Sequence, residues 1–124
     1  MANTPVIAIV DDDHSVREAL TNLVRSLGYA AIAFECAADL LKSEHRRSIS
    51  CVIADVQMPR MTGLELYRHL SESAKPLPTI LITAYPEDGA RERALAAGVI
   101  GYLSKPFDEN DLLACVRSAL TTGS

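Results

Sequence analysis

The sequence predicts an α/β fold of the doubly wound (βα)5 type, a five-stranded parallel sheet with helices on both faces. Five short apolar runs recur along the 124 residues without polar alternation, as is typical of strands buried on both faces. A turn and a segment of helical periodicity follow each run. The length suits one domain, so we expect a single domain over 1–124, with its core at about 5–120 and 121–124 as a tail or the start of a linker.

The first half of the chain contains two strand–helix units. Val6–Val10 is the first apolar run, and residues 16–27 carry apolar side chains at the spacing of one helix face. Gly28 stands where a left-handed residue would end that helix. Ala30–Phe34 is the second predicted strand, and Ala38–Glu44 is predicted as a shorter helix.

The second half contains three further units. Thr62–Glu65 has the pattern of a capping box and opens a helix. Ala90–Ala97 is rich in helix-favouring residues, and Gly98 marks its end. Asp108 can cap a last helix that ends near Leu120. The remaining strands, of which the first two are rich in β-branched residues, are predicted at Cys51–Ala54, Thr79–Thr83 and Gly101–Leu103.

Composition excludes several classes of function. The net charge of −4 disfavours direct binding to nucleic acid. No apolar run approaches the ~18 residues that a membrane span needs, so no membrane contact is expected. Met1–Pro5 lacks the basic and apolar regions of a signal peptide, and we therefore expect a cytoplasmic protein.

The informative residues follow the predicted strands. Asp11–Asp13 come after the first strand, Asp55 after the third, Thr83 ends the fourth, and Lys105 comes shortly after the fifth. Open parallel sheets bind ligands beyond the carboxyl ends of their strands. In the flavodoxin-like strand order 2-1-3-4-5, the first, third, fourth and fifth strands are neighbours. These carboxylates, the hydroxyl and the ammonium would then share one crevice.

This set of groups indicates phosphoryl chemistry. Two carboxylates about 4 Å apart repel by roughly 4 kcal/mol at an effective dielectric constant near 20, so either the side chains splay into water or a cation lies between them. Mg²⁺ fits best, since it binds carboxylates and leaves positions for phosphate oxygens. An ammonium and a hydroxyl suit the other phosphoryl oxygens. Asp55 is the best-placed nucleophile, and no further cofactor is expected.

Four motifs resemble one known family. Asp55–Gly63 has the pattern D-x-x-M-P-x-M-x-G, and V-D-D, I-T-A and Y-L-S-K-P-F occur at Val10–Asp12, Ile82–Ala84 and Tyr102–Phe107. In this order and spacing they are similar to the receiver domains of response regulators in bacterial two-component systems. The likeness covers essentially the whole chain and is strongest to receivers that precede a LuxR-type DNA-binding domain.

The resemblance implies roles for residues around the predicted crevice. Asp55 would accept the phosphoryl group and also contact Mg²⁺. Asp12 would bind the metal directly, Asp11 through water, and Gln57 through its backbone carbonyl. Asp13 is expected outside the site, at the N-terminus of the following helix, where the helix dipole favours it.

The resemblance also implies a switch. Thr83 would move to bond the phosphoryl group, Lys105 would pair with it, and Tyr102 would turn inward as Thr83 shifts. Lys105-Pro106 would be a cis peptide bond. The faces of the fourth helix, fifth strand and fifth helix would then change to control an output such as a homodimer or a DNA-binding domain outside this chain.

The implied function is therefore a phosphorylation-activated signalling switch whose partner is a sensor histidine kinase. It would not be an enzyme beyond its own phosphoryl transfer and autodephosphorylation. An alternative is a Mg²⁺-dependent phosphatase of the haloacid dehalogenase type using Asp11, because Asp11–Asp13 fits a D-x-D spacing. A dinucleotide-binding module is rejected, because acids replace the glycine-rich loop after the first strand. The chain is either a stand-alone receiver or part of a longer regulator.

Overall fold

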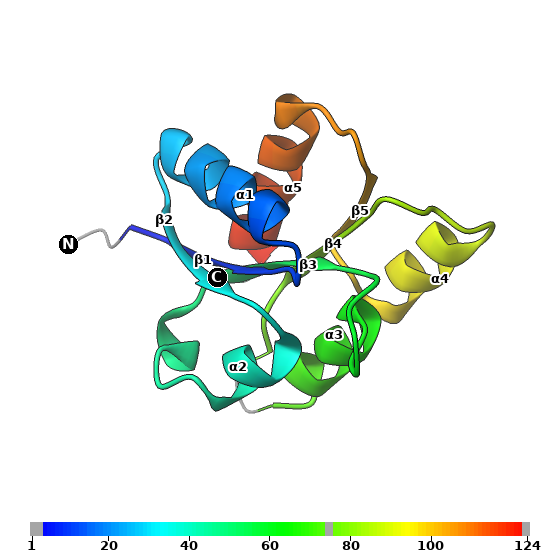
Figure 1. Ribbon diagram of the computed structural model, residues 1–124, viewed down its shortest axis with the longest axis horizontal. Helices are drawn as coiled ribbons and strands as arrows, with labels where there is room; N and C mark the ends of the chain where they lie inside the picture. The colour runs from blue at the N-terminus through cyan, green and yellow to red at the C-terminus, as the bar shows by residue number, and fades with distance from the viewer. Residues whose placement is uncertain (1–3, 74–75, 123–124) are drawn as a thin grey trace.

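The computed structural model describes residues 4–73 and 76–122, in which strands and helices alternate along the chain (Figure 1). The strands pair in parallel in the order β2-β1-β3-β4-β5, which confirms the predicted fold class. The elements are β1 (Val6–Val10), α1 (His14–Ser26), β2 (Ala30–Phe34), α2 (Ala37–Lys42), the 3-10 helix η1 (Arg46–Ser48), β3 (Cys51–Asp55), α3 (Gly63–Ser71), β4 (Thr79–Thr83), α4 (Ala90–Ala97), β5 (Gly101–Ser104) and α5 (Glu109–Thr122).

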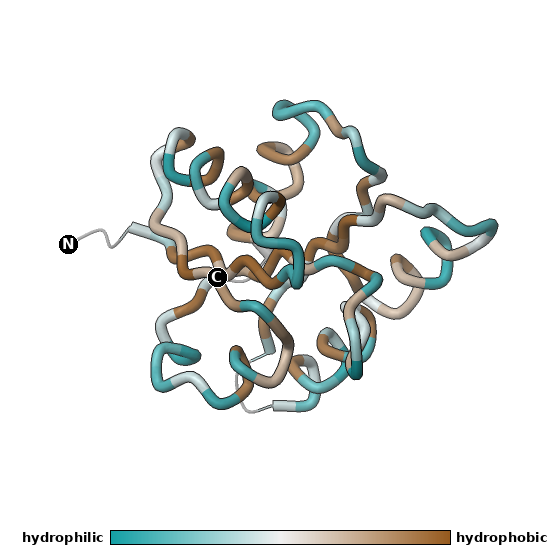
Figure 2. Tube along the Cα trace, viewed as in Figure 1, coloured by the Kyte–Doolittle hydropathy of each residue, from teal (hydrophilic) through white to brown (hydrophobic). Residues whose placement is uncertain are grey.

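Helices cover the sheet on both sides. Figure 1 shows α1 and α5 on one face and α2, α3 and α4 on the other. Side chains alternate along β1: Ile7 and Ile9 pack with α1 and α5, whereas Ala8 and Val10 pack with the opposite cluster. The hydrophobic residues consequently run along the central strands, as the brown tube in Figure 2 shows. The core thus has two layers with the sheet between them.

Local signals set the starts of α1 and α3. Asp13 caps α1, where its Oδ1 accepts hydrogen bonds from the backbone N–H groups of Ser15 (2.9 Å) and Val16 (3.2 Å). The capping box of Thr62 and Glu65 opens α3 with bonds of 3.1 and 2.9 Å. These contacts satisfy N–H groups that the first turn of a helix leaves unpaired.

Several predicted bounds are corrected. β3 and β5 each extend one residue further than predicted, and α2 begins at Ala37 and ends at Lys42 rather than spanning 38–44. The 3-10 helix η1 was not predicted. α5 continues to Thr122, so residues 121–122 belong to the helix rather than to a tail, and the Thr121 hydroxyl donates to the Arg117 carbonyl (2.9 Å). Residues 123–124 lie outside the described residues.

The register of the sheet brings four strand ends to one edge. Val10 pairs with Ala54, Asp55 with Ile82, and Thr83 with Ser104. The residues that end or follow β1, β3, β4 and β5 are therefore neighbours in space. None of the helices in residues 4–73 and 76–122 combines the length and apolar character that crossing a bilayer requires.

Candidate functional site

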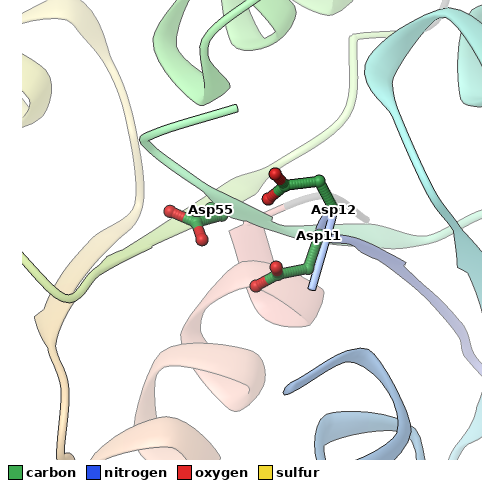
Figure 3. A group of neighbouring side chains, drawn as sticks. All are labelled: Asp11, Asp12 and Asp55. Atoms are coloured by element: carbon green, nitrogen blue, oxygen red, sulfur yellow. The ribbon is translucent and has the colours of Figure 1, made fainter. Parts of the chain in front are cut away.

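Three carboxylates meet at this edge of the sheet. Asp11 and Asp12 extend from the end of β1 toward Asp55 at the end of β3 (Figure 3). One carboxylate oxygen of each lies within 4.8 Å of the others. Asp11 is fully buried and Asp55 is 8% exposed, whereas Asp12 is exposed to solvent. The cluster is therefore open on the side of Asp12.

The two buried carboxylates are held in the same way. Oδ1 of Asp11 accepts a hydrogen bond from the backbone N–H of Asp13 (2.9 Å), and Oδ1 of Asp55 accepts one from Gln57 (2.9 Å). Each bond spans two residues, as in an Asx turn. Both turns fix one oxygen of the carboxylate and leave Oδ2 available for other contacts.

Lys105 lies between the two free oxygens. Its Nζ is 3.6 Å from Oδ2 of Asp11 and 3.5 Å from Oδ2 of Asp55. The Lys105 backbone N–H donates to the Thr83 carbonyl (2.7 Å), which ties the loop after β5 to β4. The Lys105-Pro106 peptide bond is cis, as the resemblance implied. A single ammonium thus faces both carboxylates from the end of the neighbouring strand.

The charges in the cluster are incompletely balanced. Burial raises the pKa of Asp11 above its usual value, and the nearby Asp55 carboxylate raises it further, while the Asp13 N–H and Lys105 act in the opposite direction. Oδ2 of Asp11 is also the one buried side-chain oxygen without a hydrogen-bond partner in the described part of the chain. A hard divalent cation with oxygen ligands would satisfy this atom, so the residues present fit Mg²⁺.

We expect Asp11→Asn to stabilise the metal-free protein at neutral pH. A raised pKa means that the folded state binds more protons than the unfolded state, so this carboxyl lowers stability as pH rises through its range. Removing its charge should therefore raise the thermal midpoint of unfolding measured in EDTA. The advantage should shrink as the pH falls below the raised pKa of Asp11. A midpoint below that of the wild type at neutral pH would contradict the expectation.

Thr83 lies at the same edge but is bonded elsewhere. Its side chain is fully buried. Its Oγ1 donates to Oε1 of Gln57 (2.7 Å) and accepts from the backbone N–H of Tyr85 (3.0 Å). The single proton of this hydroxyl is therefore already donated to Gln57.

Tyr102 belongs to the hydrophobic core. It is 7% exposed and clusters with Ala94 and Val99, on the side of the sheet that α4 covers. Burial raises the pKa of its phenol, and Glu87 adds to this effect. The ring therefore already has an inward position in this structure.

Sequence reasoning missed two contacts in the site. Nη1 of Arg17 donates to the backbone carbonyl of Asp11 (2.7 Å), while Nη2 lies 3.9 Å from Glu35. The side-chain amide oxygen of Gln57 accepts a hydrogen bond from the Thr83 hydroxyl (2.7 Å), a contact that was not predicted. An arginine one turn into α1 was the available signal for the first contact. No local pattern indicated the second.

Known proteins with similar sequences bear on this site. Residues 7–117 match the family model described as the response regulator receiver domain. The response regulator protein TodT of Pseudomonas putida is 40% identical over 115 residues, which are 93% of this chain and 51% of that protein. TmoT of Ectopseudomonas mendocina, also a response regulator protein, is 42% identical over 115 residues, 93% of this chain and 52% of its own. The chain thus spans about half the length of these curated relatives.

Solved structures agree with these sequence matches. The response regulator StyR superimposes with a TM-score of 0.87 at 37% identity, covering 98% of this chain and 61% of that one. The FixJ-N structure gives a TM-score of 0.84 at 26% identity, and the superposition covers 98% of this chain and 96% of that one. These matches cover the whole sheet together with the edge at which the carboxylates meet.

Proposed function

Since this chain belongs to the family of response regulator receiver domains and is therefore a phosphorylation-dependent signalling switch, we propose that the switch operates through phosphorylation of Asp55. One observation carries this proposal: Oδ2 of Asp55 and Oδ2 of Asp11 converge on Nζ of Lys105 at the carboxyl edge of the sheet. Oδ2 of Asp55 is the oxygen that its backbone turn leaves free for attack on phosphorus.

The proposed reaction is a phosphoryl transfer. A histidine kinase would present a phosphohistidine, and a carboxylate oxygen of Asp55 would form a bond to phosphorus as the P–N bond breaks and the imidazole leaves with the bonding electrons. Lys105 would pair with a phosphoryl oxygen. The side chains of Asp11, Asp12 and Asp55 and the carbonyl of Gln57 would hold Mg²⁺, which supplies positive charge to the phosphoryl oxygens when bound.

The proposed response is a rearrangement near α4 and β5. A phosphoryl group on Asp55 offers three strong acceptors, and the Thr83 hydroxyl can donate to one of them only by giving up its present acceptor, Oε1 of Gln57. Moving a two-state equilibrium from 1:99 to 99:1 takes about 5.5 kcal/mol, which contacts to a cation, an ammonium and a hydroxyl can together provide. Repacking at Tyr102 would carry the change to the α4–β5–α5 face.

We extend the proposal to the surroundings of the chain. TodT and TmoT are named as response regulators and are about twice as long as the segment matched here. An output domain that binds DNA, in a longer protein containing this chain, and a phosphorylation-dependent homodimer are therefore proposed partners. A cytoplasmic location is proposed too. Histidine kinases take their phosphoryl group from ATP in the cytoplasm, so a protein that receives this group would have to be in the same compartment. Catalysis would be limited to the chain's own phosphorylation and dephosphorylation.

The proposal is tested by intact-mass measurement after incubation with Mg²⁺ and acetyl phosphate. We expect the mass of one phosphoryl group to be added, and we expect no addition when EDTA removes the metal. Acetyl phosphate replaces the kinase because its acyl phosphate can react directly with the carboxylate.

Two results would contradict the proposal. The first is the absence of an adduct with both acetyl phosphate and a phosphorylated kinase domain. The second is steady release of phosphate from a small phosphate ester over many turnovers, which is the behaviour of the haloacid dehalogenase-type phosphatase. The comparisons give that alternative no support.

A further inference from the structure

The side chain of Gln57 joins the two loops that flank the phosphoacceptor. Its Oε1 accepts a hydrogen bond from the buried Thr83 hydroxyl (2.7 Å), and its Nε2 donates to the Tyr85 carbonyl (3.4 Å). The backbone N–H of the same residue donates to Oδ1 of Asp55 (2.9 Å). One residue therefore holds the phosphoacceptor through its backbone and the Thr83 hydroxyl through its side chain.

We propose that the Gln57 side chain is a latch, which holds the Thr83 hydroxyl in the unphosphorylated position and has to be released when Asp55 is phosphorylated. Gln57 would be a positioning residue, acting on the reaction through Thr83. The inference rests on the proposed function of Asp55 and Thr83, and adds a regulatory contact to it.

The hydrogen-bond capacity of a hydroxyl supports this role. Threonine has a single hydroxyl proton, and in this structure that proton is directed at Oε1 of Gln57. A phosphoryl oxygen is only an acceptor, so it needs the same proton. The hydroxyl can donate to Gln57 or to the phosphoryl group but not to both, and the two states therefore exclude each other.

Burial makes the choice energetically significant. Thr83 is fully buried, and a buried hydroxyl that loses its acceptor is strongly disfavoured. The bond to Gln57 therefore stabilises the unphosphorylated state specifically. Its release also frees the Tyr85 carbonyl from Nε2 of Gln57, which loosens the loop between β4 and α4 at the point where the signal has to pass.

A different role for Gln57 would leave a different signature. The amide could orient a water that attacks the phosphorylated aspartate. That role would change the lifetime of the phosphorylated state without involving the Thr83 hydroxyl. The latch instead predicts an energetic coupling between Gln57 and Thr83 in a complex that undergoes no hydrolysis.

The test measures binding of beryllofluoride, a phosphoryl mimic, at saturating Mg²⁺. Gln57→Met keeps the length of the side chain and its backbone carbonyl but removes both side-chain hydrogen bonds. Losing one hydrogen bond of the unphosphorylated state should tighten binding by about fivefold. In the background of Thr83→Val, which lacks the hydroxyl, Gln57→Met should tighten binding less than in the wild type, because only the bond to the Tyr85 carbonyl remains to be lost. Thr83→Ser is the matched background because serine keeps the hydroxyl. In that background Gln57→Met should again tighten beryllofluoride binding by about fivefold.

A second measurement uses protein without metal or mimic. The Tyr85 N–H donates to the Thr83 hydroxyl (3.0 Å), so its ¹⁵N chemical shift and hydrogen-exchange rate report where that hydroxyl is. We expect Gln57→Met to shift this resonance and accelerate its exchange, while the amides of α1 stay unchanged. The unchanged α1 amides show that the variant is folded.

The outcomes separate the latch from the proposed function. If the wild type binds beryllofluoride and Gln57→Met leaves the affinity unchanged, weakens it, or tightens it equally in the Thr83→Val background, the latch is wrong and the phosphorylation switch stands. If the wild type binds no beryllofluoride and accepts no phosphoryl group, the proposed function fails and the latch fails with it.

Discussion

Replacing Asp55 with Asn is expected to abolish phosphoryl incorporation. The amide oxygen is a far weaker nucleophile than a carboxylate oxygen, and losing an enzyme's nucleophile lowers rates by factors of about 10⁶ in well-studied cases. We expect the adduct formed with acetyl phosphate and Mg²⁺ to fall by more than about a thousandfold, measured by intact mass over time. The variant should fold, because the Asn oxygen can still accept the hydrogen bond from the Gln57 N–H.

Two companion variants make this result specific. Asp39→Asn changes an exposed aspartate in the first turn of α2, which does not belong to the carboxylate cluster, and should be phosphorylated like the wild type. Asp11→Asn should be phosphorylated slowly, since it keeps Asp55 but loses a metal ligand. If the adduct persisted in Asp55→Asn and disappeared in Asp11→Asn, the nucleophile would be Asp11 rather than Asp55. That result would favour the phosphatase alternative.

The second large effect is expected at Gly63, the first residue of α3. A Cβ at this position would lie 2.5 Å from the backbone carbonyl oxygen of Asp55 and 2.8 Å from Cδ2 of Leu81. The backbone of β3 cannot yield easily, because β3 is buried and paired on both sides. We expect Gly63→Ala to lower the free energy of unfolding by about 3 kcal/mol, measured by urea denaturation. Phosphorylation should slow as well, since Asp55 would be displaced.

Gly28→Ala is the matched control for this effect. Gly28 has a φ of +97°, and no heavy atom lies within 4 Å of the position of an added Cβ. Alanine there meets only the cost of the left-handed conformation, about 1–2 kcal/mol, with no displacement of the site. Equal losses of stability in the two variants, with phosphorylation unaffected in both, would contradict the role of close packing at Gly63.

The sequence by itself was sufficient for the architecture and for the expectation that Asp11, Asp55 and Lys105 meet at one edge of the sheet. Val6–Val10 is apolar throughout and Thr79–Thr83 is apolar between its two threonines, so burial on both faces could be inferred directly, and the strands have those bounds. Thr62 was predicted to open a capping box and Asp13 to lie at the N-terminus of the first helix, because both inferences depend on neighbouring residues alone. Where the pattern was weak, in Ala38–Glu44 and at the end of α5, the predicted bounds were wrong.

What only the tertiary structure decided is how the site residues contact one another. The sequence predicted that Asp11, Asp55 and Lys105 meet, but not that Nζ of Lys105 is nearly equidistant from two oxygens left free by matching turns. The contact of Gln57 with Thr83 and that of Arg17 with the Asp11 carbonyl were not predicted. Caps and buried runs depend on residues close in the chain, which a sequence displays directly. The site contacts depend on strand register and side-chain rotamers, which are determined only when the whole sheet and its helices pack together.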